Sequence, residues 1–318
     1  MILVGDIGGT NTRLALFEQG KEVGEEKKFI SRNYKGLEEI VLSYLQGRRV
    51  EKACFGIAGP VRNGVCKATN LPWIVDAAQL GKVAHIPAVY LLNDLESNAY
   101  GLLVLRKEEF CVLNQGVVQA GNQALIAAGT GLGEAGLYWD GQVHRPFACE
   151  GGHTDFAPRD EMEIELLNYL RAKISHVSYE RVISGPGLYA IFQFLIDSKK
   201  YTLHSVVKEE IEHSDPAKVI SKWGAEKKDP ACQHALDWFV SLYGAEAGNL
   251  ALKMLALGGL YIGGGIVTQI VKKMQEGSFM SSFVNKGRFQ QLLASIPIKI
   301  ILNDRAALLG ALAYAEGQ

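Results

Sequence analysis

Three carboxylates of the sequence stand in contexts that could do chemistry. Asp94 follows Asn93 at the end of an apolar run, where a carboxylate can either cap a helix or act as a general base. Glu150 precedes two glycines and His153, so an acid and an imidazole share a flexible turn and could hydrogen-bond the vicinal hydroxyls of a sugar. Glu180 precedes a Ser-Gly-Pro-Gly turn, and taken alone it is expected to be an exposed helix acid.

Glycine-rich segments form the second group of candidates. The chain has 35 glycines among 318 residues, where an average share of roughly 7% would give about 22. Asp6 and Ile7 precede Gly8-Gly9-Thr10-Asn11, a second cluster spans Gly129–Gly133, and a third lies between Gly258 and Gly265. Because glycine lets backbone approach a ligand closely, the excess indicates binding loops.

The first two clusters resemble hairpin turns rather than known nucleotide fingerprints. Neither the Walker A pattern nor GxGxxG is present, and an apolar, β-branched segment follows the first cluster. A glycine hairpin turn with free N–H groups can wrap a phosphate, and Asp6 at the end of the preceding strand could hold Mg²⁺ through water. A simple Gly-Gly β-turn remains the alternative. The third cluster, around Gly263 and Gly264, would let an adenosine lie against backbone.

The elements that position these residues follow an α/β pattern. Strands are predicted at Ile2–Ile7 and Thr12–Phe17, around the first cluster, and again at Ala124–Ala128 and Ala135–Trp139, around the second. This spacing suggests an internal repeat, with two unrelated hairpins as the alternative. Further strands are predicted at residues 25–30, 53–58, 88–92, 260–262 and 298–302.

Helices are predicted from apolar periodicity and from caps. Leu37, Ile40, Val41, Tyr44 and Leu45 form the stripe of an amphipathic helix. A helix at Glu161–Ala172 should begin at the N-cap Asp160, a mostly helical region spans Pro186–Leu257, and Ile266–Met274 is expected to be one helix. An Ala- and Leu-rich helix is predicted to end at Ala315.

Composition excludes several classes of protein. Lys and Arg number 33 against 34 Asp and Glu, a net charge of −1, which argues against a nucleic-acid partner. Five dispersed cysteines signal neither a disulfide framework nor a metal site and favour a reducing cytoplasm. The first residues do not form a signal peptide, and no apolar run is a convincing membrane span.

Taken together, these motifs resemble those of bacterial ATP-dependent glucokinases. The similarity rests on residues 6–11, 92–94, 128–133, 150–158, 176–187 and 260–267 in their order and spacing, and it extends from end to end. The resemblance implies the two-domain actin-like ATPase (ribonuclease H-like) fold of the hexokinase type, with a cleft between the domains that closes on the sugar. The expected small α/β domain comprises residues 1–106 and 297–318, and the large α/β domain with a helical insertion comprises residues 107–296.

The resemblance also implies roles for individual residues. Asp94 would be the catalytic base that takes the proton of the glucose 6-hydroxyl, and Asp6 would hold Mg²⁺ through water. The residues implied to bind sugar are Asn70, Asn93, Asp94, Glu150, His153 and Glu180. Those implied to bind ATP are Asp6, Gly8, Gly9, Thr10, Asn11, Thr130, Gly131, Gly263 and Gly264.

Two further expectations follow from the resemblance. Glucose and ATP would be the ligands, and the chain would form a homodimer. Two alternative functions stay open: a kinase for another hexose such as mannose or fructose, and a non-catalytic sugar or nucleotide sensor. Glu134 departs from the pattern, because a small apolar residue is expected after the second turn. If Glu134 points into the cleft, nucleotide affinity would be altered.

Overall fold

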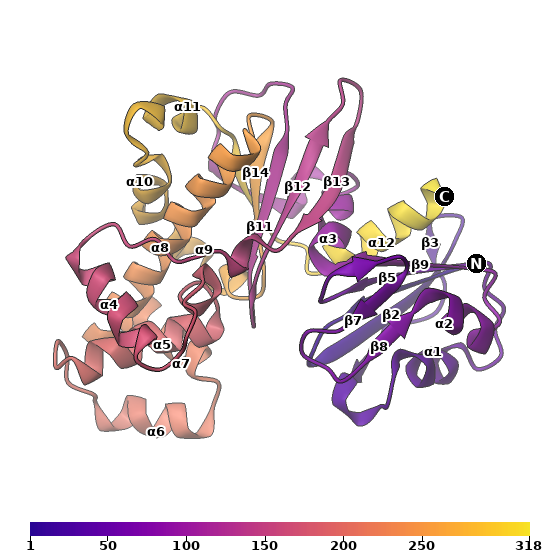
Figure 1. Cartoon of the computed structure of the whole chain (residues 1–318), viewed down its shortest axis with the longest axis horizontal. Coiled ribbons are helices and arrows are strands. Elements are labelled where there is room, and N and C mark those ends of the chain that lie inside the picture. Colours follow the sequence, from indigo (N-terminus) through magenta and orange to yellow (C-terminus); the bar gives the residue numbers. More distant parts are fainter. The chain divides into compact units, whose positions relative to one another are not determined.

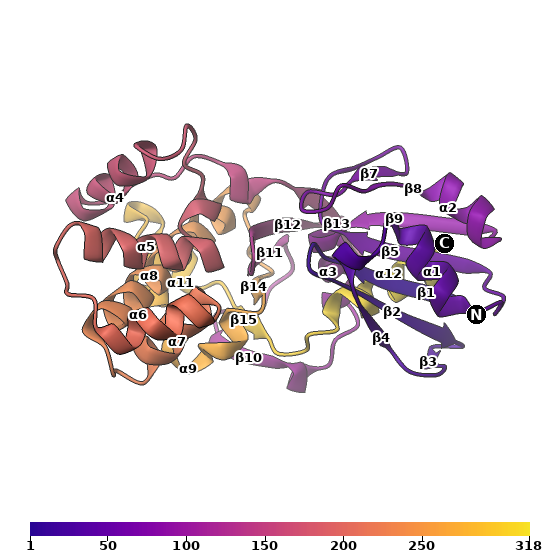
Figure 2. The ribbon, with the colours of Figure 1, turned by 90° about the horizontal axis from the view of Figure 1, so that it is seen from below.

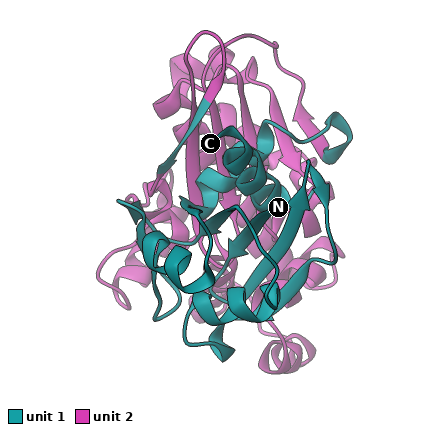
Figure 3. Ribbon diagram, turned by 90° about the vertical axis from the view of Figure 1, so that its right-hand side faces the viewer, with its two compact units in different colours: residues 1–109, 145–148, 303–318 teal, residues 110–144, 149–302 magenta.

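The computed structural model describes residues 1–318, which form two compact units (Figure 3). Unit 1 comprises Met1–Glu109, Arg145–Ala148 and Asn303–Gln318, and unit 2 comprises Phe110–His144 and Cys149–Leu302. No helix of the chain combines the length and the apolar composition needed to cross a membrane. Each unit is an α/β assembly that is described by itself below.

Unit 1 is built on a sheet with the strand order β3-β2-β1-β5-β9, in which β4 also pairs with β2. Its strands are β1 (Ile2–Ile7), β2 (Asn11–Glu18), β3 (Lys21–Glu22), β4 (Lys27–Ile30), β5 (Lys52–Ile57) and β9 (Ala88–Asn93). β1 runs antiparallel to β2 and parallel to β5, and β5 runs parallel to β9. A small sheet joins β6 (Val61–Arg62), β7 (Val65–Lys67) and β8 (Ile74–Asp76).

Helices cover both faces of this sheet (Figure 1). Because side chains alternate along a strand, Leu3 packs with α1 (Leu37–Leu45) and α2 (Ala77–Ala84), whereas its neighbour Val4 packs with α12 (Ala306–Gly317). α3 (Asp94–Leu102) packs against α12. The predicted stripe of α1 is confirmed, since all five of its apolar residues are buried.

Unit 2 repeats the strand plan of unit 1. Its sheet has the order β10-β15-β14-β11-β12-β13. The strands are β10 (Phe110–Asn114), β11 (Gln123–Ala128), β12 (Leu132–Trp139), β13 (His144–Cys149), β14 (Gly259–Gly263) and β15 (Ile298–Ile301). β11 pairs antiparallel with β12 through a glycine turn and parallel with β14, as β1 does with β2 and β5. The internal repeat predicted from the two glycine hairpins is therefore present in the fold.

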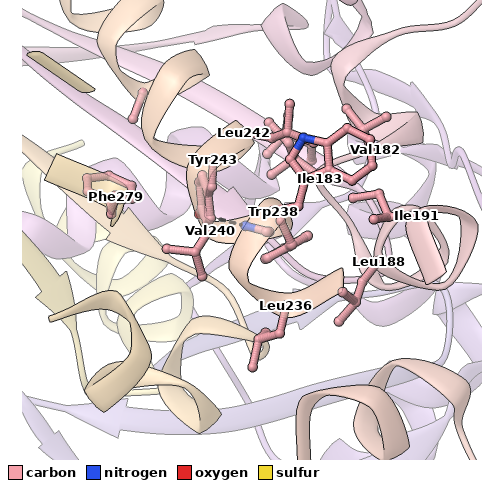
Figure 4. Packing of buried hydrophobic residues seen from close by; sticks show 14 of the residues in the cluster. Val182, Ile183, Leu188, Ile191, Leu236, Trp238, Val240, Leu242, Tyr243 and Phe279 are labelled. Carbon is pink, nitrogen blue, oxygen red and sulfur yellow. Dashed lines mark hydrogen bonds between the residues drawn. The ribbon is translucent and has the colours of Figure 1, made fainter. Parts of the chain in front are cut away.

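A helical region packs on one face of the sheet in unit 2. It contains α4 (Glu161–Arg171), α5 (Gly185–Asp197), α6 (Ser205–His213), α7 (Pro216–Ala225), α8 (Pro230–Met254), α9 (Val271–Met274), α10 (Ser278–Val284) and α11 (Gln290–Ala294). α5 and α7 lie beside α8 (Figure 2). Figure 4 shows the core that they share, in which Ile191, Trp238 and Phe279 come from α5, α8 and α10. The predicted helical region and the Asp160 cap are confirmed.

One predicted helix is wrong. Residues 266–274 form a 3-10 turn at Val267–Gln269 and the single turn α9, separated by Ile270, whose φ of −118° and ψ of 23° are not helical. Val267 and Ile270 are both buried, which explains the apolar spacing on which the prediction rested. Because this segment is rich in β-branched residues, burying those side chains outweighs a weak helical preference.

Candidate active site

Parallel pairing brings the candidate residues of unit 1 to one edge of its sheet. The register aligns Ile7 with Ile57 and Ile57 with Asn93, so β1, β5 and β9 end at the same level. The glycine turn after β1 and the Asn93-Asp94 pair after β9 therefore lie at the carboxyl edge of the sheet. In open α/β sheets this edge is the usual place for a ligand.

Asn93 is the residue that caps α3. Its Oδ1 accepts hydrogen bonds from the N–H groups of Leu95 (2.9 Å) and Glu96 (3.3 Å), and its Nδ2 donates to the carbonyl of Gly59 (3.2 Å). Asp94 is the first helical residue, half-buried, and its Oδ1 also accepts from Leu95 N–H at 2.9 Å. The capping role that the sequence allowed for Asp94 thus belongs mainly to Asn93, which fixes where the Asp94 carboxylate stands.

The first glycine turn is fixed by hydrogen bonds to its carbonyl groups, and two of its N–H groups stay available to a ligand. Gly8 N–H donates to Asn11 O (2.9 Å), while Ser31 donates to Thr10 O from its N–H (3.0 Å) and to Gly8 O from its hydroxyl (2.9 Å). The N–H groups of Gly9 and Thr10 donate to no group of the chain. Ser31, which the sequence did not single out, thus binds two carbonyl groups of the turn and leaves two N–H groups of the kind that can bind an anion.

Asn70 lies directly against this turn. A Cβ atom on Gly9 would stand 2.5 Å from the Asn70 Cβ, closer than real Cβ atoms come. Glycine at this position is therefore what lets Asn70 approach the turn. Asn70 is exposed, so its amide can reach a ligand at the carboxyl edge.

Asp6 is held by Arg13, a residue that the sequence prediction missed. Arg13 contacts Asp6 Oδ2 through Nη2 (2.9 Å) and Nε (3.3 Å), and it also binds Asp304 Oδ2 (3.2 Å) and the Asp304 carbonyl (2.6 Å). The Asp6 and Arg13 side chains are both largely buried. Burial lowers the pKa of Arg13, but the neighbouring Asp6 and Asp304 carboxylates outweigh it, so the net shift is upward. Asp6 thus has a fixed orientation.

In unit 2 the second glycine turn joins β11 and β12. Gly129 N–H donates to Gly131 O (2.8 Å), and Gly185 N–H donates to Gly129 O (2.8 Å). The N–H groups of Thr130 and Gly131 donate to no group of the chain, as in the first turn. Leu132 N–H donates to Glu180 Oε2 at 3.0 Å, so the turn is fastened to Glu180.

The third glycine cluster lies beside the second turn. β14 runs parallel to β11 with Gly263 opposite Ala127, and Gly264 has φ +94° with its Cα packed against the Ala128 backbone. Only glycine fits both the positive φ and this approach. Below, the buried Tyr243 hydroxyl accepts from Ala128 N–H (3.1 Å). The second turn and Gly263-Gly264 therefore meet at one edge of the sheet.

Glu150, His153 and Glu180 gather into one cluster. His153 ends the 3-10 turn Gly151–His153, and its ring nitrogens lie 3.9 Å from Glu150 Oε2 and 4.0 Å from Glu180 Oε1. The side chains of Glu150 and His153 are about half exposed, at 52% and 50%, whereas that of Glu180 is 22% exposed. The expectation that Glu180 would be an exposed helix acid is wrong, because it sits in a 3-10 turn and supports the second glycine turn.

Glu134 does not line the second turn. Glu134 is 1% exposed, and its carboxyl group occupies the place that a Cβ on Gly151 would take, near Glu246 of α8. The condition under which it would alter nucleotide affinity, a side chain pointing into a ligand site, is thus not met.

The acidic groups fit a magnesium ion that binds together with phosphates. No group of three or more His, Cys, Asp or Glu side chains is arranged to hold a metal ion. Mg²⁺ commonly binds through one or two carboxylates, water and substrate phosphates, so a single oriented carboxylate next to a phosphate-binding turn is sufficient. Asp6, two residues before Gly8, meets this requirement.

Comparisons with known proteins show to which family the chain belongs. The glucokinase family model matches residues 3–318. The glucokinase of Nostoc sp. is 42% identical, with 98% of this chain and 97% of the relative covered.

Solved structures show the same fold. A glucokinase from an Antarctic psychrotroph has a TM-score of 0.82 and 30% identity, covering 100% of this chain and 99% of the other. A ROK-family glucokinase from Streptomyces griseus, solved with glucose and AMPPNP, has a TM-score of 0.70 and 20% identity, with 100% and 99% covered. The expected two-domain hexokinase-type fold is confirmed, and the chain belongs to the glucokinase family of ATP-dependent hexose kinases.

Proposed function

We propose that the protein transfers the γ-phosphoryl group of ATP to the 6-hydroxyl of glucose, giving glucose 6-phosphate and ADP, with Asp94 as the general base. The position of Asp94 carries this proposal: it opens α3 at the same sheet edge as the Gly8–Thr10 turn, whose free N–H groups suit a phosphate. The membership of the chain in the glucokinase family supports it.

In this reaction the protein forms no covalent bond to the transferred group. Phosphoryl transfer has a loose transition state, so positioning and charge neutralisation dominate. The sugar oxygen forms a bond to phosphorus while the bond from phosphorus to the ADP oxygen breaks, and the hydroxyl proton moves to the Asp94 carboxylate. Since this proton becomes acidic only as the O–P bond forms, an ordinary carboxylate is a sufficient base.

For the sugar we propose the following contacts, given for each unit by itself. Glu150 and Glu180 would accept hydrogen bonds from hydroxyl groups, and His153 between them would donate or accept. In unit 1 Asn70 offers an exposed amide, and Asn93 keeps one Nδ2 hydrogen beyond its bond to Gly59. Hydroxyl groups arranged as in a hexose match such a set of acids and amides.

For ATP we propose the two glycine turns and the third glycine cluster. Gly8, Gly9, Thr10 and Asn11, with Thr130 and Gly131, would hold the phosphates, and Gly263 and Gly264 would contact the adenosine. Asp6, oriented by Arg13, would hold Mg²⁺ through water. When bound, Mg²⁺ neutralises charge on the phosphate oxygens.

The decisive test compares two Asp→Asn variants in unit 1. Asp94→Asn keeps the acceptor for Leu95 N–H but removes the base, so kcat should fall by roughly 10²- to 10⁴-fold with glucose binding retained. Asp76→Asn is the matched control, because Asp76 also stands at a helix N-terminus, that of α2, and Asn caps equally well. The readout is ADP release in a coupled assay with MgATP over a panel of glucose, mannose and fructose.

Two outcomes would contradict the proposal. Near-normal turnover by Asp94→Asn would remove Asp94 from the role of base, and faster turnover of mannose or fructose than of glucose would change the substrate. The homodimer and the cytoplasmic location implied by the resemblance both stay predictions. Light scattering on the purified protein can check the homodimer.

A further inference from the structure

Two buried carboxyl groups lie against each other in unit 2. Glu134 of β12 is 1% exposed and Glu246 of α8 is 0% exposed, and the Glu246 carboxylate lies close enough to Glu134 to raise the pKa of that group. Glu134 stands opposite Ile126 in the sheet, on the face whose core includes residues of α8. None of the roles proposed above uses this pair.

The pair is short of compensating positive charge. Lys253 Nζ, 3.3 Å from Glu246 Oε1, is the cation that contacts it, and Asn249 donates to Glu246 Oε2 at 2.7 Å. No hydrogen-bond partner reaches the buried Oε1 of Glu134. Because two ionised carboxylates in such a place repel each other without solvent, they are expected to hold one proton. Burial, and next the Glu246 carboxylate, raise the pKa of Glu134 to about 8.

Glu134 supports the turn that carries Glu150 and His153. Its carboxyl group occupies the space above the Gly151 Cα, where any side chain would stand. Gly151 opens the 3-10 turn, and its carbonyl accepts from Thr154 N–H (3.0 Å) and from the Thr154 hydroxyl (2.8 Å). A shift of the Glu134 carboxyl would therefore move this turn.

Glu246 connects the same pair to Glu180. Asn249 Nδ2 donates both to the Tyr179 hydroxyl (2.9 Å) and to Glu246 Oε2 (2.7 Å), and the nearby Glu246 carboxylate adds to burial in raising the pKa of Tyr179. Tyr179 is buried and directly precedes Glu180 in the 3-10 turn Tyr179–Arg181. Both acids of the proposed sugar cluster are thus one residue away from a group in contact with the pair.

We propose that Glu134 is a positioning residue for the hexose: the Glu134–Glu246 pair, holding one proton, fixes the turns that present the sugar-binding acids. This inference rests on the proposed hexose-binding function. Loss of the proton would put two negative charges under both turns and displace them. Sugar affinity should therefore fall as the pH rises past the point at which Glu134 ionises.

Other groups around the pair titrate differently. Burial raises the pKa of Tyr243 on α8, of Tyr179 and of Cys149 on β13, so these three remain neutral at higher pH than in water. Lys286, which donates to Asn249, has its pKa lowered by burial and could also lose charge on the alkaline side. Replacing Glu134 alone separates its contribution from that of Lys286.

The test measures glucose affinity by calorimetry on the full-length protein at pH 7 and pH 9. One pH unit above a pKa of about 8, about one-tenth of the molecules keep the proton, so wild-type affinity should fall about tenfold. Glu134→Gln keeps the size and a neutral donor toward Glu246, and it should bind at pH 7 like the wild type and lose little affinity at pH 9. Glu134→Ala should bind weakly at both pH values.

Glu163→Gln is the matched control. Glu163 of α4 is also a fully buried acid of unit 2, but it is paired with Arg159, so its replacement should lower stability and leave the alkaline loss of affinity in place. Circular dichroism checks that each variant folds. If Glu134→Ala does not fold, the comparison of the wild type with Glu134→Gln decides alone.

Equal wild-type affinities at pH 7 and pH 9 would overturn the inference, as would a full alkaline loss in Glu134→Gln. So would a Glu134→Gln protein that folds but binds as weakly as Glu134→Ala. Absence of any hexose binding by the wild type at pH 7 would overturn the proposed function together with the inference. Hexose binding without the alkaline loss would overturn the inference alone.

Discussion

At the scale of single residues, the polar side chains of the candidate site differ in how many of their hydrogen-bonding atoms already have a partner in the protein. Glu180 Oε2 accepts a hydrogen bond from Leu132 N–H, and Asn93 Oδ1 accepts one from Leu95 N–H as the cap of α3. Glu150 has a half-exposed side chain, and its Oε2 lies 3.9 Å from His153 Nε2. Glu150 is therefore the acid most available to a sugar, and its replacement should disturb the fold least.

Glu150→Gln should weaken glucose binding by about 1.5 to 3 kcal/mol, since a hydrogen bond to a charged group contributes that much. The loss corresponds to roughly a 10- to 150-fold higher Kd by calorimetry. Asp155→Asn is the control, because Asp155 is an exposed acid five residues away that pairs with His176 at 2.9 Å. Unchanged affinity in Glu150→Gln, or an equal loss in Asp155→Asn, would exclude Glu150 from the sugar site.

The sequence indicated which residues are candidates for the site better than it indicated which residues contact them. Arg13 was missed although the hairpin register pairs it with Asp6, one of six residue pairs that lie symmetrically about the first turn. That symmetry could have been worked out from the two predicted strands. No comparable signal pointed to the Glu134–Glu246 pair, because 112 residues separate them and only the packing of α8 on the sheet brings them together.

At the scale of elements, the strands and long helices were predictable from periodicity, whereas the short segments were not. The strands of both hairpins and α4 follow apolar spacing and caps. The 3-10 turns at Gly151–His153 and Tyr179–Arg181 have no such period, and they contact Glu134 and Leu132, which lie elsewhere in the sequence. Local sequence patterns therefore located the candidate acids but did not predict the shape of the turns in which they lie.

The glycine excess also has an explanation at this scale, which can be tested with two adjacent residues. Gly264 has φ +94° and a Cβ there would clash with the Ala128 backbone, whereas a Cβ on Gly265 would meet nothing within 4 Å. Gly264→Ala should destabilise the protein by about 1 to 3 kcal/mol from backbone strain alone, with the clash adding to it. Urea denaturation of both variants measures this. Gly265→Ala should stay within about 0.5 kcal/mol of the wild type, and equal losses in the two variants would refute the close approach of β14 to β11.

At the scale of the whole molecule, the free energy of unfolding should depend on pH through buried groups whose pKa shifts act in opposite directions on stability. Burial lowers the pKa of His234, so its contribution is complete above its unfolded value of 6.5 and is lost as the pH falls toward the folded value. Glu134 acts the other way. Its folded pKa of about 8 exceeds the ordinary 4.5, so the stability it contributes is complete below pH 4.5 and is lost as the pH rises through 8.

Comparing the wild type with Glu134→Gln isolates this one proton, because every other group is common to both proteins. Between about pH 5 and 8 the free energy of unfolding of the wild type should fall relative to that of the variant, by at most about 1.4 kcal/mol for each pH unit. Above pH 8 the two curves should become parallel. Urea denaturation at a series of pH values, without sugar or nucleotide, measures the difference. Parallel curves from pH 5 upward would mean that Glu134 is already ionised in the folded protein, and the shared proton would then have to be abandoned.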